Sequence, residues 1–278
     1  MSELIWEAQP DLASPIVIAA FEGWNDAGDG ASRALDHVIE RWGAQRFASI
    51  EPESFFDFTN HRPRIRMTGN DTRRIDWPDT VFWWATSPAG PDVVLIRGVE
   101  PHLRWKSFCA EILTVADSLS ARLVVTLGAL LADVPHTRQP TVFGTAYDPA
   151  VITALGLEPS TYEGPTGIIG VLHEQCREHG VNSASFWAAV PSYVASTPSP
   201  RAQRALVDRV AELLGTPLDT SDLAVEELRY EVEISELVAE DADTMAYVRH
   251  LEEQHDVVGE RTDVNELLAE VERYLRDR

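Results

Sequence analysis

Over the first 218 residues, short apolar runs rich in β-branched side chains alternate with stretches whose apolar residues recur at helical spacing. The first apolar run, Pro15 to Phe21, leads through a glycine-rich loop into a helical pattern over 31–42. Strands that are apolar on both faces are typical of a sheet that helices cover on both sides. The pattern therefore predicts an α/β fold, a three-layer sandwich with a mostly parallel sheet.

The same patterns of apolar runs and helical spacing predict further strands and helices. Core strands are predicted at 80–86, 92–98, 122–128, 141–145 and 183–190, and helices at 105–119, 148–155, 166–179 and 200–214. Charged and apolar residues alternate at 46–50, 64–67 and 73–75, as on a half-exposed sheet. We expect these weaker strands to include a hairpin at a sheet edge.

The last 60 residues contain no comparable strand and are more acidic, with 19 acidic and 6 basic side chains in residues 219–278. Their apolar residues recur at helical spacing, which predicts two or three helices with solvated acidic faces. We place a boundary near 215–217, between an α/β domain at 1–218 and an acidic helical segment at 219–278 that packs on it or on a neighbouring subunit. The side chains expected to be buried by this packing are Leu223, Leu228, Val264, Leu268 and Val271.

The chain carries a formal net charge of -22, so it repels phosphate backbones and anionic bilayers. We expect neither nucleic acid nor a membrane as a partner. No apolar run reaches the roughly 18–20 residues of a membrane-spanning helix, and the first residues do not resemble a signal peptide, which predicts a cytoplasmic protein. Cys109 and Cys176 fall in predicted amphipathic helices, where a thiol usually serves as a small buried hydrophobe, so no disulfide scaffold is expected.

Three loops follow the carboxyl ends of the strands predicted at 15–21, 92–98 and 122–128. Loops at this edge of an open parallel sheet line its usual ligand crevice. Their polar and aromatic side chains are our candidates for ligand binding: Glu22, Trp24, Asn25, Asp26, Arg97, Glu100, Arg104, Asp133 and His136, with His102 and Arg138 beside them. We expect five of these, Glu22, Asn25, Asp26, Arg104 and His136, to surround one cavity.

Each loop also has a purely structural interpretation. Asp26 and its neighbours can cap the helix that follows, because their side chains accept hydrogen bonds from backbone N–H groups. Arg104 can pair with Glu100 or stack on a neighbouring tryptophan. His136 can act as a general base oriented by Asp133, but a single loop histidine more often only makes surface hydrogen bonds.

Several enzyme signatures are missing from the sequence: G-x-S-x-G, the P-loop, H-E-x-x-H and C-x-x-C. The loop at 22–32 does not fit G-x-G-x-x-G, and the carboxylates of Asp26 and Asp29 would repel a pyrophosphate. We therefore expect no cofactor and no metal ion, and we assign no catalytic residue.

Five blocks occur in order along the chain: FEGWNDAGDGAS at 21–32, IRGVEPHLRWKSFCAEIL at 96–113, LGALLADVPHTR at 127–138, YEGPTGIIGVL at 162–172 and FWAAVPSYV at 186–194. Together they resemble the proteasome assembly chaperone two (PAC2) family, in its bacterial, actinobacterial-type branch, over about residues 5–215 plus a helical tail. The resemblance implies an α/β sandwich similar to purine nucleoside phosphorylases. It also implies kinship with eukaryotic proteins that act in proteasome assembly.

Two functions remain open at this point. The resemblance, the missing motifs and the acidic tail favour a protein-interaction or assembly-chaperone-like role without catalysis, with a protein partner that the resemblance suggests is related to the proteasome. The alternative is a small-molecule, nucleoside-like binding protein or enzyme that uses the three loops.

Two further expectations concern assembly. Proteins that dock into proteasome α-ring pockets commonly end in a hydrophobic residue, a tyrosine and one final residue, whereas Tyr274 is fifth from the end here, so we do not expect that route. We expect a homo-oligomer, because Phe82, Trp83 and Trp84 follow one another on a strand. An aromatic ring that faced outward there would mark a subunit interface, unless helices cover both faces of the strand.

Overall fold

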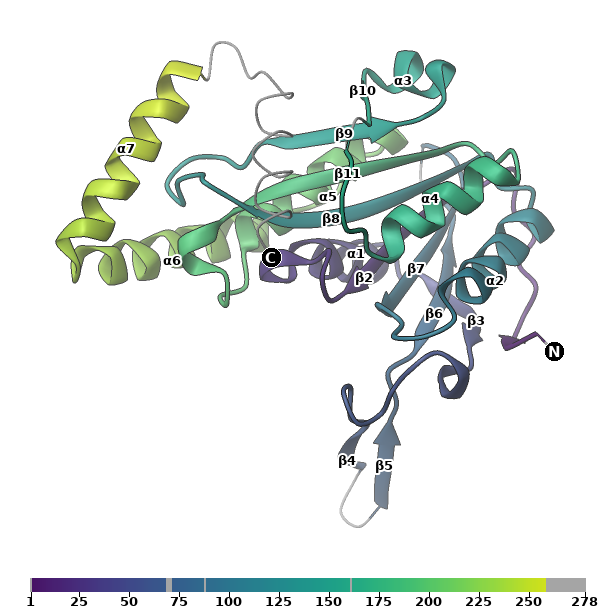
Figure 1. Ribbon diagram of the computed structural model, residues 1–278. Helices are drawn as coiled ribbons and strands as arrows, with labels where there is room; N and C mark the ends of the chain where they lie inside the picture. The colour runs from purple at the N-terminus through teal and green to yellow at the C-terminus, as the bar shows by residue number, and fades with distance from the viewer. Residues whose placement is uncertain (1, 69–71, 88, 161, 259–278) are drawn as a thin grey trace.

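A nine-stranded sheet forms the centre of the protein in the computed structural model, which describes residues 2–68, 72–87, 89–160 and 162–258 (Figure 1). Its strands lie in the order β1-β3-β6-β7-β2-β8-β11-β9-β10. Their bounds are β1 Leu4–Trp6, β2 Ile16–Glu22, β3 Gln45–Ile50, β6 Thr80–Ala85, β7 Val93–Val99, β8 Leu123–Ala132, β9 Val142–Ala146, β10 Glu158–Pro159 and β11 Ser183–Pro191.

The middle of this sheet is parallel and its flanks are mixed. Strand β2 pairs in parallel with β7 on one side and β8 on the other, and β8 pairs in parallel with β11. Antiparallel pairing begins at β6 on one flank and at β9 on the other. All of β2 except its last residue is buried, because it lies in the middle of the sheet and is covered on both faces. The carboxyl ends of the four parallel strands therefore share one edge.

Helices cover both faces of the sheet, which gives the expected layers (Figure 1). One face packs against α1 (Gly30–Arg41) and α5 (Pro200–Leu214), the other against α2 (Trp105–Ser118) and α4 (Ile168–Glu178), and a short helix α3 (Pro149–Leu155) follows β9. Two separate apolar cores result. Cys109 and Cys176 are both fully buried in the α2/α4 core, as small hydrophobes.

Strands β4 (Arg64–Thr68) and β5 (Thr72–Asp76) form a two-stranded sheet of their own. The hairpin that the sequence predicts is thus present, but it is not an edge of the main sheet. It projects away from the body of the molecule (Figure 1). The remaining weak strand, β3, pairs with β6 inside the main sheet and buries its last four residues.

Helices α6 (Ser221–Ala239) and α7 (Ala242–Val258) follow the α/β layers. Helix α6 packs against α5, and Leu223 is buried as expected. The expectation for Leu228 is wrong, since its side chain is 66% exposed. Helix α6 buries positions 223, 227, 230, 234 and 238, whose spacing of three or four residues defines one face, and Leu228 lies off that face. The expected contacts of Val264, Leu268 and Val271 lie outside the described residues.

The aromatic residues of β6 do not form an outward-facing patch. Phe82 is fully buried, Trp83 packs partly on the α1/α5 core and Trp84 partly on the α2/α4 core. Phe82 thus fits the alternative interpretation, in which all three rings are buried, whereas Trp83 and Trp84 stay partly exposed and β6 is antiparallel to both of its neighbours. Among the described helices, none is both long enough and apolar enough to cross a lipid bilayer.

Candidate functional site

The loop after β2 places Asp26 as a cap for α1. One carboxylate oxygen accepts hydrogen bonds from the backbone N–H groups of Ala31, at 2.8 Å, and Ser32, at 3.1 Å. The capping interpretation is therefore confirmed for Asp26. The other oxygen, Oδ2, is buried and has no hydrogen-bond partner among the described residues. Burial raises the pKa of this carboxyl to about 6, against the opposing effect of its hydrogen bonds.

A second group on the same edge is an ion-pair cluster of Glu22, Arg97 and Asp36. The Arg97 guanidinium donates to Glu22 at 2.5 Å and to Asp36 at 3.0 Å. This cluster joins β2 and β7 to helix α1. Asp36 was not among the candidates from sequence, because it lies within helix α1 and not in one of the three loops.

Glu100 joins three elements at the carboxyl edge. Its carboxylate accepts hydrogen bonds from the Asn25 side chain at 3.3 Å, from the Trp24 N–H at 3.4 Å and from the Ile168 N–H at 2.8 Å. The loop after β2, the loop after β7 and the first turn of α4 are thereby held together. A Cβ at Gly167 would lie 2.3 Å from the Asn25 amide nitrogen and 2.6 Å from a Glu100 carboxylate oxygen, so a side chain at this position would displace both groups.

Arg104 lies apart from these groups. Its guanidinium is 3.5 Å from Glu3 and stacks over the Phe55 ring, 5.5 Å from the ring centroid, so the proposed contacts with Glu100 or a tryptophan are wrong. Arg104 takes a left-handed backbone conformation, φ 54°, just before α2 begins. His102, two residues earlier, accepts a hydrogen bond from the Asp57 N–H at 3.2 Å.

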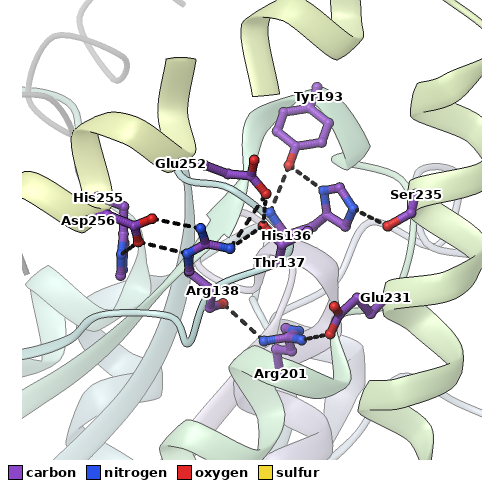
Figure 2. A network of polar contacts seen from close by, with 10 residues as sticks. All are labelled: His136, Thr137, Arg138, Tyr193, Arg201, Glu231, Ser235, Glu252, His255 and Asp256. Carbon is purple, nitrogen blue, oxygen red and sulfur yellow. Dashed lines mark hydrogen bonds and ion pairs between the residues drawn. The ribbon is translucent and has the colours of Figure 1, made fainter. Parts of the chain in front are cut away.

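His136 belongs to a network that connects the loop after β8 to helices α6 and α7 (Figure 2). Its Nδ1 is 2.7 Å from the Tyr193 hydroxyl and its Nε2 is 3.0 Å from the Ser235 hydroxyl. Asp133 instead accepts hydrogen bonds from Tyr247 and Ser192. The suggested pairing of His136 with Asp133 is therefore wrong, and both ring nitrogens are occupied by hydroxyl groups.

Arg138 links this network to α7. Its guanidinium makes a two-pronged contact with Asp256, at 2.8 and 2.7 Å, and lies 3.5 Å from Glu252, which also accepts from Thr137 (Figure 2). Planar two-pronged pairs of this kind are among the stronger charge-assisted hydrogen bonds. The loop after β8 is thus clamped onto α7.

Arg201 makes the corresponding link to α6. Its side chain is 10% exposed, pairs with Glu231 on α6 and donates to the Arg138 carbonyl at 3.1 Å (Figure 2).

We expect Arg201→Met to destabilise the packing of α6 by about 2 kcal/mol, because it leaves a half-buried carboxylate and a carbonyl without their donor. Amide hydrogen exchange along α6 would measure this. Arg177→Met removes a pair of which Arg177 is 59% exposed, and should cost about 0.5 kcal/mol or less.

The five residues expected around one cavity thus lie in separate groups. Of the sequence candidates, Trp24 and Asn25 line a cavity of about 140 Å³ on the α4 side of the sheet, between the loop after β2, strands β8, β9 and β11, and the start of α4. Its other lining residues are Ala129, Leu130, Phe143, Thr145, Ala146, Tyr147, Ser160, Tyr162, Pro165, Thr166, Ile169, Gly170, His173, Ser185 and Trp187.

Aromatic rings and hydroxyl groups form most of the cavity wall, and its described lining contains no carboxylate, lysine or arginine. The Trp187 ring packs closely against the main chain of β8, where a Cβ at Gly128 would be 2.4 Å from the ring. The Trp187 Nε1–H donates to Ser185 at 3.0 Å, and Ser185 is 2.9 Å from the Thr145 hydroxyl. The cavity therefore suits an uncharged ligand with a planar ring better than an ion.

His173 adds a polar group without adding charge. Its Nε2 is 2.8 Å from the buried Thr126 hydroxyl. Burial lowers its pKa to about 4, so the imidazole is neutral at neutral pH. Neither His173 nor the aromatic residues of β9 and β11 were among the sequence candidates. Across the described residues, no cluster of His, Cys, Asp or Glu side chains is arranged to hold a metal ion.

Comparisons with known proteins agree on one family. The sequence profile of the PAC2 family matches residues 20–238. No curated protein matches the chain. The fold is similar to a crystal structure of a PAC2 family protein from Streptomyces avermitilis, with 42% identity and a TM-score of 0.79, over 84% of this chain and 99% of that one.

Two mycobacterial structures are also similar. A proteasome-assembly chaperone homologue from Mycobacterium tuberculosis shares 44% identity, with a TM-score of 0.76, over 84% of this chain and 99% of that one. A protein of unknown function from the same organism has 26% identity and a TM-score of 0.85, over 99% of this chain and 96% of that one. The profile match and the two structures above 40% identity show that the chain belongs to the PAC2 family.

Proposed function

We propose that this protein is an assembly chaperone that binds proteasome subunits before they are incorporated. The observation that carries the proposal is the 44% identity to a proteasome-assembly chaperone homologue that is matched over 99% of its length. The geometry of the loops supports a binding role. Their charged side chains hold elements of the fold together, as Glu100, Arg97 and Arg138 do, and leave the cavity lined by uncharged groups.

The experiment uses the full chain and purified proteasome α and β subunits from the same host, mixed separately and together. We expect native mass spectrometry to detect a complex with at least one subunit type, and ring assembly to be faster when the chain is present. An unrelated protein of similar net charge is the matched control, because a charge of -22 attracts basic surfaces without specificity. Binding to neither subunit type, or equal binding by the control, would contradict the proposal.

The cavity favours a second candidate function, the binding of a small molecule with one uncharged planar ring. A volume of about 140 Å³ is close to that of cavities that hold one benzene-sized ring. Trp24 and Tyr147, which are 41% and 51% exposed, lie in the wall, and Ser185 and His173 supply hydrogen-bonding groups. The sequence leaves open a nucleoside-like ligand. This second candidate retains only the binding of its ring, without a site for a phosphate.

Titration with indole tests this second candidate. We expect a saturable shift of the Trp187 indole N–H signal in NMR spectra, since that group lines the cavity. Thr166→Trp should abolish the shift, because Thr166 lines the cavity and is exposed enough to accept a larger side chain. Thr114→Trp, at an exposed position on α2, should leave it intact. An unsaturable shift, or one that survives Thr166→Trp, would exclude a ring site.

A further inference from the structure

The projecting hairpin β4–β5 has one apolar face that nothing in the described chain covers. Cross-strand pairing places Ile65 opposite Ile75 and Met67 opposite Arg73, so these four side chains share a face. Ile65, Met67 and Ile75 are 65%, 59% and 50% exposed. A two-stranded hairpin is marginal on its own in water, and apolar patches that project from a surface usually mark interaction sites.

The hairpin is also the basic part of an acidic protein. Residues 62–76 contain five arginines and two aspartates, whereas the whole chain carries a net charge of -22. Asp76 pairs with Arg66 and Arg74, which partly neutralises the face opposite the apolar one. Positive charge and exposed apolar surface therefore coincide in one projecting element.

Helix α6 combines an exposed apolar stripe with negative charge, which complements the basic hairpin. Val225, Leu228 and Val232 are 49%, 66% and 57% exposed, and their spacing of three and four residues places them in one stripe. This stripe lies away from the face that α6 buries against the body. The helix carries six acidic residues and one arginine. Asp222, Glu227 and Glu231 pair with arginines of the same chain, so the negative charge available for docking comes from the other three, Glu226, Glu233 and Glu236. Glu236 continues the line of the stripe one turn beyond Val232.

The hairpin and α6 lie at separate ends of the molecule (Figure 1). We propose that the hairpin of one copy docks on the exposed stripe of α6 of a second copy, with Ile65, Met67 and Ile75 against Leu228 and its neighbours. Apolar burial supplies the affinity, and the opposite charges of the two elements orient the approach. The proposal goes beyond the proposed function, because it concerns the chain alone.

Such a contact joins two different surfaces, so the copy that gives its hairpin keeps a free stripe and the copy that gives its stripe keeps a free hairpin. Contacts of this type close into a ring when the rotation between copies permits it, and otherwise extend into a chain of subunits. The consecutive aromatic residues of β6, which suggested an interface from sequence, pack wholly or partly on the two cores and take no part in the proposed contact.

Sedimentation velocity on the full chain at micromolar concentration is the first test. We expect an oligomer that dissociates to monomers in the hairpin variant Ile65→Ser/Met67→Ser/Ile75→Ser and in the α6 variant Leu228→Ser/Val232→Ser. All five positions are exposed, and unchanged circular dichroism and melting temperature would establish that both variants fold. The matched control is Leu237→Ser, which is 59% exposed on α6 but outside the stripe and should leave the oligomer intact. A monomeric wild type, or an oligomer that persists in both variants, overturns the proposal.

Cross-linking identifies the contact itself. Cys109 and Cys176 are fully buried, so a short bis-maleimide reacts only with introduced thiols. We expect a Met67→Cys protein mixed with a Leu228→Cys protein to give a linked dimer, and either protein alone to give none. Met67→Cys mixed with Leu237→Cys should stay unlinked. Equal linking in all mixtures, or none in the first, rejects docking of the hairpin on α6.

Discussion

Phe108→Ala should lower the free energy of unfolding by about 3–5 kcal/mol, since it removes a large ring from a core that cannot close over the gap. Phe108 on α2 is fully buried and packs edge-on against Phe21 of β2, with ring centroids 5.9 Å apart, and against Phe55, at 5.4 Å. The ring thus connects the helix layer to the central strand. Urea denaturation of the full chain would measure the loss.

The control for this change is Leu103→Ala, two residues before the same helix. Leu103 is 49% exposed, so its truncation should change stability by only about 0.5 kcal/mol. If the two variants lose similar amounts, then Phe108 does not belong to a tightly packed core and the assignment of the α2/α4 layer needs revision.

The stability of the protein should also depend on pH through His173. Its folded-state pKa of about 4 lies below the ordinary value of 6.5, so the native state holds the neutral form. The stability that depends on a neutral His173 is fully present above pH 6.5. As the pH falls from 6.5 to 4, the unfolded state binds a proton that the native state does not, and the free energy of unfolding falls by about 3 kcal/mol. His136, whose pKa burial also lowers, acts in the same direction.

Asp26 acts in the opposite direction, because its pKa is raised to about 6 and the folded state favours its protonated form as the pH falls. The wild-type curve alone therefore does not isolate His173. His173→Gln should remove most of the change in the free energy of unfolding with pH that His173 causes. The stabilities of the variant and the wild type should therefore converge as the pH falls from 6.5 to 4. His179→Gln, at an exposed position after α4, should follow the wild type in parallel. Parallel curves for both variants would show that His173 is not held neutral.

The elements of the fold could be predicted because apolar periodicity follows burial directly. The run at 15–21 is apolar throughout, and β2 is covered on both faces; the helical pattern at 200–214 corresponds to α5. Some helices have apolar residues on two different faces. The periodicity of the sequence does not determine which of these faces is buried. Helix α6 buries the face of Leu223 and exposes that of Leu228, and only its packing on α5 decides between them.

The candidate site was predicted less well because its wall comes from strands that are distant in sequence. Strand β9 runs antiparallel to β11 and brings Thr145 beside Ser185, a pairing that alternation of strands and helices does not reveal. Trp24 and Asn25 were found from their position after β2. Charged loop residues such as Arg97 attracted attention as ligand groups, whereas the folded chain uses them to join its own elements.

The position of β2 in the sheet has a consequence for synthesis on the ribosome. This strand leaves the ribosome before both of its neighbours, β7 at Val93–Val99 and β8 at Leu123–Ala132. The nascent chain must therefore carry a strand that is apolar on both faces until β8 has been translated, before a stable sheet can form around it. Translation pauses or trigger-factor-like holdases that shield residues 16–22 during this interval would determine how much of the protein reaches the folded state.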